Sequence, residues 1–225
     1  MGKLSIVATP IGNLEDITLR ALRTLKECDV IYAEDTRVTA KLLARYEIKK
    51  PLQRLDAVTE AKKAEEVLAR LEAGEHVALV SDAGTPGISD PGVRLLRHIR
   101  TNGRMRIEAI PGASALTAAL SISGVDTSEG FTFYGFLPHK KGRQTAVKKI
   151  AASEVPVVLY ESPHRILKLL GEIENIAPAA RVTVCRELTK LHEEVLSGTP
   201  ADLAKQLEER KAARGEFVVI VEPRL

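Results

Sequence analysis

Short runs rich in β-branched residues alternate with amphipathic segments along the first half of this chain of 225 residues. The amphipathic segments repeat their apolar residues with a period of about 3.6, which predicts helices, and the short apolar runs predict buried strands. The candidates are strands at 4–9, 29–33, 76–80 and 106–110 and helices at 18–27, 38–46, 61–74, 93–103 and 113–123. Strands that alternate with helices pair in parallel, so we expect an α/β domain with a mainly parallel sheet.

A polar turn, GVDTSEG at 124–130, separates this half from a second one. Turn-forming residues with little apolar surface to bury are typical of a domain boundary. The expected domains are therefore residues 1–124 and residues 125–225, the second also α/β but with a mixed sheet. Its strand candidates are 131–136, 155–161, 181–187, 193–198 and 216–222, and its helix candidates lie near 143–151, 162–175 and 200–213.

The composition is that of an ordinary globular protein. With 44% apolar residues, 28% charged residues and a net charge of +3, the chain can bury a core, and its overall charge favours no particular partner. Cys28 and Cys185 show no metal-ligand spacing, which predicts reduced thiols, no metal site and a cytoplasmic protein. No segment has the features of a signal peptide or a membrane span, so no membrane partner is expected.

Irregular loops follow the strands of the first half: TPIGNLED, AEDTR, SDAGTPGISDPG and IPGASA. In open parallel sheets, ligands bind beyond the carboxyl ends of the strands, so these loops should line one crevice. The third loop is neither GxGxxG nor GxxxxGK[ST], and Pro86 and Pro91 lack the N–H groups that a phosphate cradle uses. With Asp82 and Asp90, this loop suits a ligand with ribose hydroxyls, an amino group and a positive centre, such as S-adenosylmethionine. Alternatively, its glycines only form tight turns and Asp90 only caps the next helix.

Charged side chains gather in three places in the second half. The stretch PHKKGRQTAVKK at 138–149 has five Lys and Arg residues and no acidic residue, which fits either phosphate binding or a solvated face. YESPHRI at 160–166 and CRELTKLHEE at 185–194 follow strands, and their polar residues suit either a site or an ion-pair network. The chain has only four Phe, four Tyr and no Trp, which disfavours a general single-strand binder because few rings can stack bases.

Seven motifs, taken together and in order, carry a resemblance to a known family. They are ATPIGNLEDITLRAL at 8–22, AEDTR at 33–37, SDAGTPGISDPG at 81–92, IPGASALTAAL at 110–120, FYGFLPHKKGR at 133–143, YESPHRI at 160–166 and CRELTKLHEE at 185–194. They resemble the bacterial 2′-O-ribose cytidine methyltransferases of small-subunit ribosomal RNA, which belong to the tetrapyrrole-methylase superfamily. The resemblance covers essentially the whole chain.

The resemblance implies a fold, a reaction and partners. The fold would be two α/β domains of tetrapyrrole-methylase type with the cofactor, S-adenosylmethionine, in the cleft between them. The reaction would be 2′-O-methylation of a cytidine in 16S ribosomal RNA, with the small ribosomal subunit or its RNA as partner, and the enzyme would be a homodimer. Carried over by motif, the cofactor residues would be Pro10, Ile11, Asp82, Ala83, Gly84, Thr85, Ile88, Ser89, Pro111, Gly112, Ala113, Ser114 and Ala115.

Methyl transfer to a ribose hydroxyl needs in-line alignment and an acceptor for the hydroxyl proton. We expect Asp35 or Glu187 to accept the proton, with Arg37 and Arg186 holding the adjoining phosphates. A general dinucleotide-fold argument would instead assign Glu34 or Asp35 to the cofactor ribose. The residues expected to bind RNA are Lys140, Lys141, Arg143, His164 and Arg165.

Two segments depart from the family pattern. Members commonly carry a His- and Asn-bearing segment where this chain reads LQRLDAVTEAKK at 52–63, and many continue for several dozen residues beyond the last strand, whereas this chain ends at EPRL. Two other functions are compatible with parts of the sequence. A small-molecule methyltransferase acting on a tetrapyrrole precursor would use the same loops but not the basic stretch, and an RNA-binding assembly factor without turnover would not need the cofactor loops.

Overall fold

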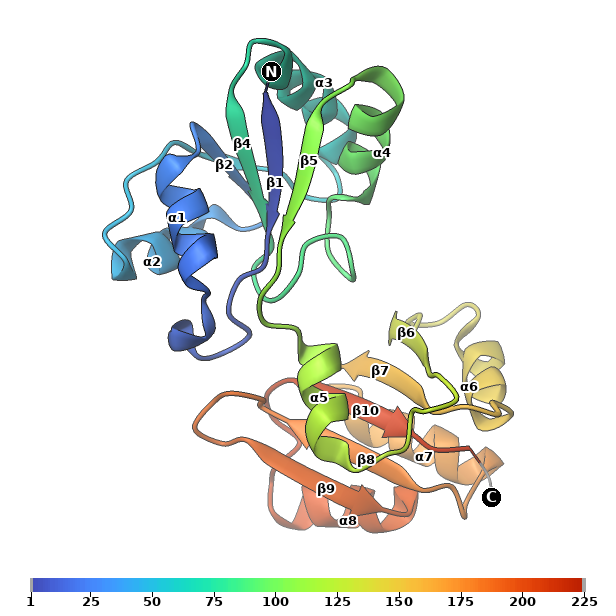
Figure 1. Cartoon of the computed structure of the whole chain (residues 1–225). Helices are drawn as coiled ribbons and strands as arrows, with labels where there is room; N and C mark the ends of the chain where they lie inside the picture. Colours follow the sequence, from blue (N-terminus) through green and yellow to red (C-terminus); the bar gives the residue numbers. More distant parts are fainter. Residues whose placement is uncertain (1, 224–225) are drawn as a thin grey trace. The chain divides into compact units, whose positions relative to one another are not determined.

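The computed structural model describes residues 2–223, which form two compact units (Figure 1). The first unit ends at Ser114 and the second begins at Ala115. The expected boundary after residue 124 is therefore too late by one helix, α5 (Ala115–Ser123). This helix packs on strands β8 (Val182–Arg186) and β10 (Phe217–Val221) of the second unit, with Ala119 fully buried. The apolar contact, rather than the polar turn that follows it, decides where the chain divides.

The first unit contains a parallel sheet of five strands in the order β3-β2-β4-β1-β5. The strands are β1 (Lys3–Val7), β2 (Val30–Ala33), β3 (Leu52–Arg54), β4 (His76–Val80) and β5 (Arg106–Ile110). The helices are α1 (Leu19–Glu27), α2 (Thr36–Arg45), α3 (Glu60–Glu72) and α4 (Val93–Asn102), with a short 3-10 helix at Leu14–Asp16. The parallel pairing agrees with the sequence pattern, which missed only the edge strand β3 and the 3-10 turn.

Two apolar cores lie on the two faces of this sheet. Successive strand residues point to opposite faces, so Tyr32 packs with α3 and α4 while its neighbour Ile31 packs with α1 and α2. Both side chains are fully buried. The Tyr32 hydroxyl donates a hydrogen bond of 2.7 Å to Glu66 on α3, which satisfies its only buried polar atom. The sheet is thus fixed from both sides, and its carboxyl edge presents the loops.

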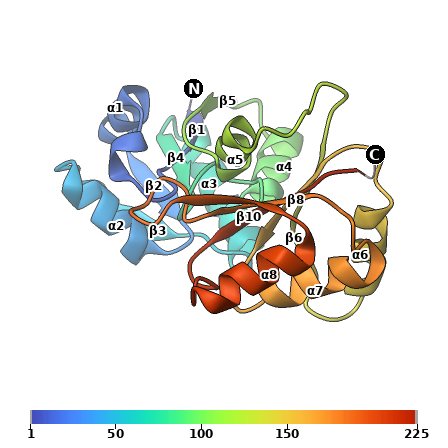
Figure 2. The ribbon, with the colours of Figure 1, turned by 90° about the horizontal axis from the view of Figure 1, so that it is seen from below.

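The second unit contains a mixed sheet in the order β6-β7-β10-β8-β9. Its further elements are β6 (Thr132–Phe136), β7 (Val157–Glu161), β9 (Glu194–Gly198), α6 (Arg143–Ala151), α7 (Ile166–Ile176) and α8 (Pro200–Glu209). Strands β6 and β7 are parallel, and the other pairs are antiparallel. Figure 2 shows α6, α7 and α8 on one face of this sheet and α5 on the other.

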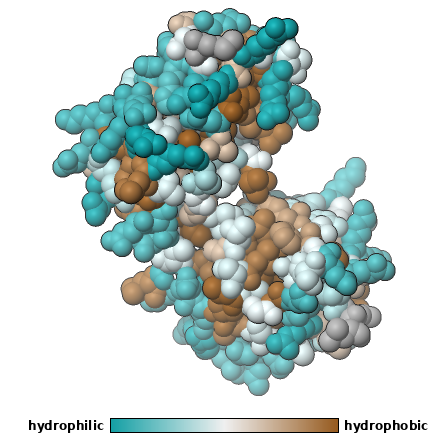
Figure 3. All heavy atoms as spheres, viewed as in Figure 1, coloured by the Kyte–Doolittle hydropathy of each residue, from teal (hydrophilic) through white to brown (hydrophobic). Residues whose placement is uncertain are grey.

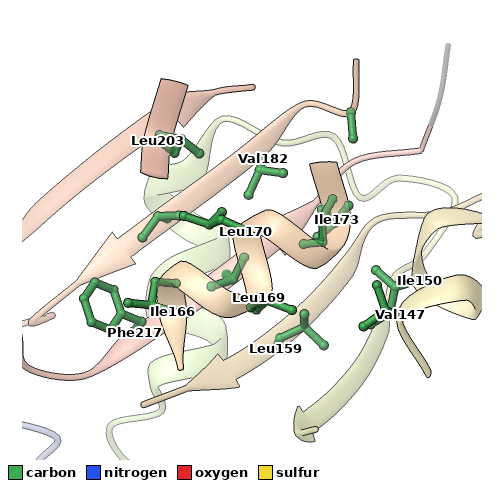
Figure 4. Close-up of a cluster of buried hydrophobic side chains, with 14 of the residues drawn as sticks. Val147, Ile150, Leu159, Ile166, Leu169, Leu170, Ile173, Val182, Leu203 and Phe217 are labelled. Carbon is green, nitrogen blue, oxygen red and sulfur yellow. The ribbon is translucent and has the colours of Figure 1, made fainter. Parts of the chain in front are cut away.

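The core of the second unit is built around α7 (Figure 4). Its buried residues Ile166, Leu169, Leu170 and Ile173 are spaced by three and four positions, so they form one apolar face toward the sheet. They pack against strand residues such as Leu159, all fully buried. Each such side chain contributes roughly 1.5–3 kcal/mol by leaving water. This core fixes the start of α7, whose first residue, Ile166, is the last residue of the YESPHRI motif.

Candidate functional site

The loops after β1 and β4 are joined directly at the carboxyl edge of the first sheet. Thr9 and Gly84 form an isolated backbone bridge, with N–H to carbonyl distances of 2.9 and 3.0 Å. The Thr9 hydroxyl donates a further hydrogen bond of 3.0 Å to the carbonyl of Ser81. Because Thr9 and Ser81 are buried, these bonds are protected from water and hold the two loops in one register.

Gly84 lies where three loops meet. Its φ of +81° lies in the left-handed region, which residues other than glycine rarely adopt. A Cβ atom built on it would lie 3.5 Å from Cγ2 of Ile11 and 3.7 Å from the carbonyl oxygen of Ala113. The loops after β1, β4 and β5 therefore approach one another at this glycine, which is the convergence that the parallel sheet predicts.

A buried carboxylate on α3 fixes the other end of the β4 loop. Glu60 is only 4% exposed, and its Oε1 accepts hydrogen bonds of 2.9 Å from the backbone N–H groups of both Gly92 and Leu95. It thereby satisfies two N–H groups at the beginning of α4. The alternative in which Asp90 only caps this helix is wrong, because the acceptor comes from Glu60, on a helix distant in sequence. No local sequence signal marks Glu60 for this role.

Acidic side chains line the same edge of the sheet. Asp82 accepts a hydrogen bond of 3.0 Å from the backbone N–H of Asp35, which joins the β4 loop to the loop after β2. Burial, together with the charges of Glu34 and Asp82, raises the pKa of Asp90 to about 6. Burial and the charge of Asp82 likewise raise the pKa of Glu34. Three carboxyl groups gathered at one edge favour a cationic ligand nearby, and the raised pKa values of Glu34 and Asp90 reflect this crowding of negative charge.

The expected cofactor residues differ in exposure. The structure buries Pro10, Ile11 and Gly84, leaves Asp82, Thr85, Ala113, Ser114 and Ala115 half-buried, and exposes Ala83, Ile88, Ser89, Pro111 and Gly112. The buried ones form the floor of the loop cluster and the exposed ones lie on its surface. All except Ala115, the first residue of the second unit, belong to the first unit.

Asp35 and Arg37 form a local pair at the beginning of α2. The Asp35 carboxylate accepts hydrogen bonds from the backbone N–H of Arg37, at 2.9 Å, and from its Nε, at 3.0 Å. The side-chain hydrogen bond from Arg37 holds the pKa of Asp35 well below its usual range. A carboxylate with so low a pKa is a weak proton acceptor at neutral pH, and its clearest role is to orient Arg37, whose side chain is 86% exposed.

Glu187 is held in a second ion pair, in the other unit. Its carboxylate accepts hydrogen bonds of 2.9 Å from Lys190 Nζ and from the backbone N–H of Glu216. Burial would raise the pKa of Glu187, but these two hydrogen bonds lower it overall. Arg186 donates to the carbonyl of Arg214 at 2.9 Å and lies 3.7 Å from Glu194, so its guanidinium is already engaged. This geometry disfavours Glu187 as the proton acceptor.

The structure corrects the expectation that Arg143 lies on the surface with the neighbouring lysines. Arg143 is only 2% exposed, and its Nε lies 2.8 Å from Glu172 while its Nη1 lies 3.4 Å from Glu161. Arg165 is paired with the same Glu161 at 2.7 Å. Both arginines neutralise buried carboxylates, so neither is free to bind a phosphate as the sequence suggested.

The two arginines hold the backbone of the basic loop, which we define as residues 138–142. Arg165 donates to the carbonyl of Leu137 at 3.0 Å, and Arg143 donates to the carbonyl of Pro138 at 3.4 Å. Lys140 and Lys141 lie two and three residues after Pro138 and are exposed. His164, in the segment between β7 and α7, is exposed as well. The buried ion pairs therefore present a fixed pair of lysines to the solvent.

Both cysteines are buried, and the described residues contain neither a candidate metal site nor a candidate membrane span. Cys28 and Cys185 are both buried free thiols, and burial raises the pKa of each to about 11, which makes them poor nucleophiles. Among the described residues, no His, Cys, Asp and Glu side chains gather in a way that could hold a metal ion. No helix within residues 2–223 combines the length and apolar character needed to cross a bilayer.

Comparison with known proteins adds relatives in sequence and in structure. Residues 3–204 match the family of Tetrapyrrole (Corrin/Porphyrin) Methylases. Ribosomal RNA small subunit methyltransferase I of Thermotoga maritima is 45% identical over 221 residues, which cover 98% of both chains. The protein of the same name from Xylella fastidiosa is 47% identical over 224 residues, which cover 98% of this chain and 81% of that one.

Two solved structures share the fold at low sequence identity. The methyltransferase CobJ superimposes with a TM-score of 0.74 at 18% identity, covering 99% of this chain and 95% of that one. The cobalamin biosynthetic enzyme cobalt precorrin-4 methyltransferase gives a TM-score of 0.70 at 18% identity, covering 98% of this chain and 94% of that one. At this identity the likeness concerns the fold alone.

Proposed function

Because the chain belongs to the tetrapyrrole methylase family and, within it, to the ribosomal RNA small subunit methyltransferase I proteins, we propose that it methylates the 2′-oxygen of a cytidine in 16S ribosomal RNA. The chain is a methyltransferase, and the family and fold class predicted from its motifs are confirmed by these matches. The observation that carries the proposal is the identity of 45% over 98% of both chains with a relative of that name.

We further propose S-adenosylmethionine as the methyl donor. It supplies an electrophilic methyl group on a positively charged sulfur. The residues at the carboxyl edge of the first sheet fit such a molecule, because Gly84 adds no side chain where three loops meet and Asp82 and Asp90 offer carboxylates to a cation. The prolines of the β4 loop remove N–H groups that a phosphate would need, and this donor contains no phosphate.

The remaining task of the protein is to position the ribose hydroxyl and manage its proton. Alignment of the reacting atoms at about 3 Å accounts for a large share of the acceleration in such reactions. Asp35 and Glu187 stay candidates for the proton acceptor, but their ion pairs favour an electrostatic role for Arg37, Arg186 and Lys190 instead. Cations near the reacting oxygen stabilise the negative charge that develops on it.

The proposed partner is the small ribosomal subunit or its RNA, which would place the protein in the cytoplasm. A homodimer is part of the same proposal and is supported by the resemblance alone. Lys140, Lys141 and His164 are the exposed residues that we propose as phosphate contacts, since Arg143 and Arg165 are engaged in buried ion pairs.

Transfer of labelled methyl groups tests the proposed function directly. Purified small subunits, free 16S RNA and a tetrapyrrole precursor are each incubated with the protein and labelled S-adenosylmethionine. Label in alkali-resistant dinucleotides of the RNA is the expected result, because a methylated 2′-oxygen cannot assist strand cleavage. Label in the tetrapyrrole alone would favour the small-molecule methyltransferase. RNA that binds without label would favour the assembly factor.

Binding of the cofactor should depend on the protonation of Asp90. Below about pH 6 this carboxyl group is protonated and no longer attracts a cation, so affinity should fall as the pH is lowered from 7.5 to 5. In Asp90→Asn the affinity at pH 7.5 should be several-fold weaker and its pH dependence flatter. Calorimetric titration across this range measures both effects.

A stability measurement distinguishes this role from a structural one. The pKa of Asp90 is raised above the value of about 3.9 expected in the unfolded chain, so its ionised form destabilises the fold at pH 7.5. Asp90→Asn should therefore keep or raise the free energy of unfolding there. Asp126→Asn, in an exposed turn of the second unit, is the control and should leave affinity unchanged. If cofactor affinity depends on pH in the same way in Asp90→Asn and in the wild type, the assignment of Asp90 to the cofactor site is contradicted.

A further inference from the structure

Most aromatic residues of this chain lie in one small region of the second unit. Of four Phe and four Tyr, five belong to residues 131–136 of the β6 segment and to β7: Phe131, Phe133, Tyr134, Phe136 and Tyr160. Three of them are unusually exposed for rings, with 41% of Phe131, 39% of Tyr134 and 54% of Phe136 accessible. Aromatic rings at the surface are typical of binding sites rather than of folding cores.

A bulge in β6 turns two of these rings to the same face. The pairing with β7 shifts between Phe133 and Gly135, so that Phe133 pairs with Val158 and Phe136 pairs with Tyr160. Val158 and Tyr160 are two residues apart on β7 and therefore share one face of the sheet. Phe133 and Phe136 contact the Tyr160 ring edge-on, with centroids 4.9 and 5.7 Å apart. We name these three rings the aromatic patch.

Within the second unit the patch is partly covered, since Phe136 is exposed while Phe133 and Tyr160 are half-buried. Tyr160 pairs with Val218 on β10, which pairs with Cys185 on β8, so all three lie in one row on one face. Helix α5 covers the Cys185 end of the row, where the thiol lies 4.0 Å from the carbonyl of Ala119. Helices α6, α7 and α8 cover the opposite face. Figure 3 shows the resulting apolar surface over β6 and β7.

Cationic side chains follow the patch closely along the chain. Phe136 precedes Lys140 by four residues, a span of at most roughly 14 Å in an extended chain. The buried pairs of Arg143 and Arg165 fix the intervening backbone, and residues 138–149 contain no acidic side chain. Rings next to fixed cations match a ligand that has flat apolar groups and negative charges along one strand.

We propose that the aromatic patch stacks an unpaired base of the RNA substrate while Lys140 and Lys141 contact its phosphates. The proposal rests on the proposed function, and it adds that the RNA is bound in a single-stranded segment, because a paired base does not offer its face. A second copy of this chain fits less well as the occupant, since it would bring a second set of uncompensated lysines toward the first.

A single tryptophan can report on this contact, because the chain contains none. In Phe136→Trp the ring is kept, so RNA binding should be retained and the emission should be quenched when a single-stranded fragment of 16S RNA binds. A duplex of the same sequence, at equal phosphate concentration, should quench it far less. Leu19→Trp, 86% exposed on α1 of the first unit, is the control and should not respond.

A truncation separates stacking from charge. Phe136→Ala should weaken binding of the single strand about tenfold, a typical effect of losing one stacked ring, and leave the salt dependence of binding unchanged. Thermal unfolding verifies that this variant folds. Two results would overturn the role of the patch but not the proposed function. One is an unchanged RNA affinity in Phe136→Ala. The other is an unchanged Phe136→Trp emission when the protein binds an RNA that the Leu19→Trp protein also binds.

Two further outcomes have distinct meanings. A blue shift of the Phe136→Trp emission that grows with protein concentration, in the absence of RNA, would show that a second copy covers the patch and would overturn the proposal. Failure of the wild-type protein to bind either RNA or small subunits would overturn the proposed function, and the stacking proposal with it.

Discussion

Replacing Gly84 with valine is expected to weaken S-adenosylmethionine binding at least 100-fold, which corresponds to about 2.7 kcal/mol. Gly84 has a φ of +81°, which a β-branched residue adopts only with strain. The new side chain would also point into the space between Ile11 and Ala113, where three loops approach one another. Both effects displace the surface that we propose for the cofactor. Isothermal titration calorimetry measures the loss.

Gly74 provides a matched control for the strain alone. It has a φ of +93°, nothing lies within 4 Å of a Cβ built on it, and it precedes β4 at the opposite edge of the sheet. Gly74→Val should therefore lower the free energy of unfolding about as much as Gly84→Val does, but it should keep the cofactor affinity of the wild type. If Gly84→Val binds the cofactor as the wild type does, the loop is not the binding site.

Reversing the charges of Lys140 and Lys141 together should weaken RNA binding by on the order of 100-fold near physiological salt. Each phosphate contact contributes about 0.7–0.9 to the slope of log affinity against log salt, so losing two should reduce the slope by roughly 1.4–1.8. The exposed side chains of both lysines make this possible without loss of the core. Filter binding over a range of salt concentrations gives the slope, and cofactor affinity should not change.

The control for this variant is the pair Lys148 and Lys149, which are exposed on α6 and carry the same charge. Reversing them alters the net charge equally but leaves the basic loop intact, so the slope should change much less. Equal losses in the two double variants would show that bulk charge, and not the loop, determines RNA binding.

The sequence predicted those parts of the fold that depend on local periodicity. Alternating apolar runs and amphipathic segments gave nearly all strands and helices, while β3 was missed because three residues carry no detectable period. The convergence of the loops was predictable as well, since parallel strands bring their carboxyl ends to one edge. In the structure the loops after β1, β4 and β5 approach one another at Gly84, next to Ile11 and Ala113.

Residues whose role depends on a distant partner escaped prediction. Arg143 belongs to a run of basic residues and looks exposed, but Glu161 and Glu172 neutralise it in the core. Glu60 looks like an ordinary first residue of a helix, yet it binds the N–H groups of Gly92 and Leu95. Such pairings arise only when elements pack, and no spacing within the chain reveals them.

The β4 loop is tied down at both of its ends, and this limits how it can move. Gly84 is bonded to Thr9 at one end, and Gly92 is bonded to Glu60 at the other. A displacement of this loop that keeps both anchors is therefore confined to residues 85–91. Pro86 and Pro91 further restrict the backbone rotations available there. If this loop moves to admit a ligand, we expect a short displacement of residues 85–91, with the sheet and its helices unchanged.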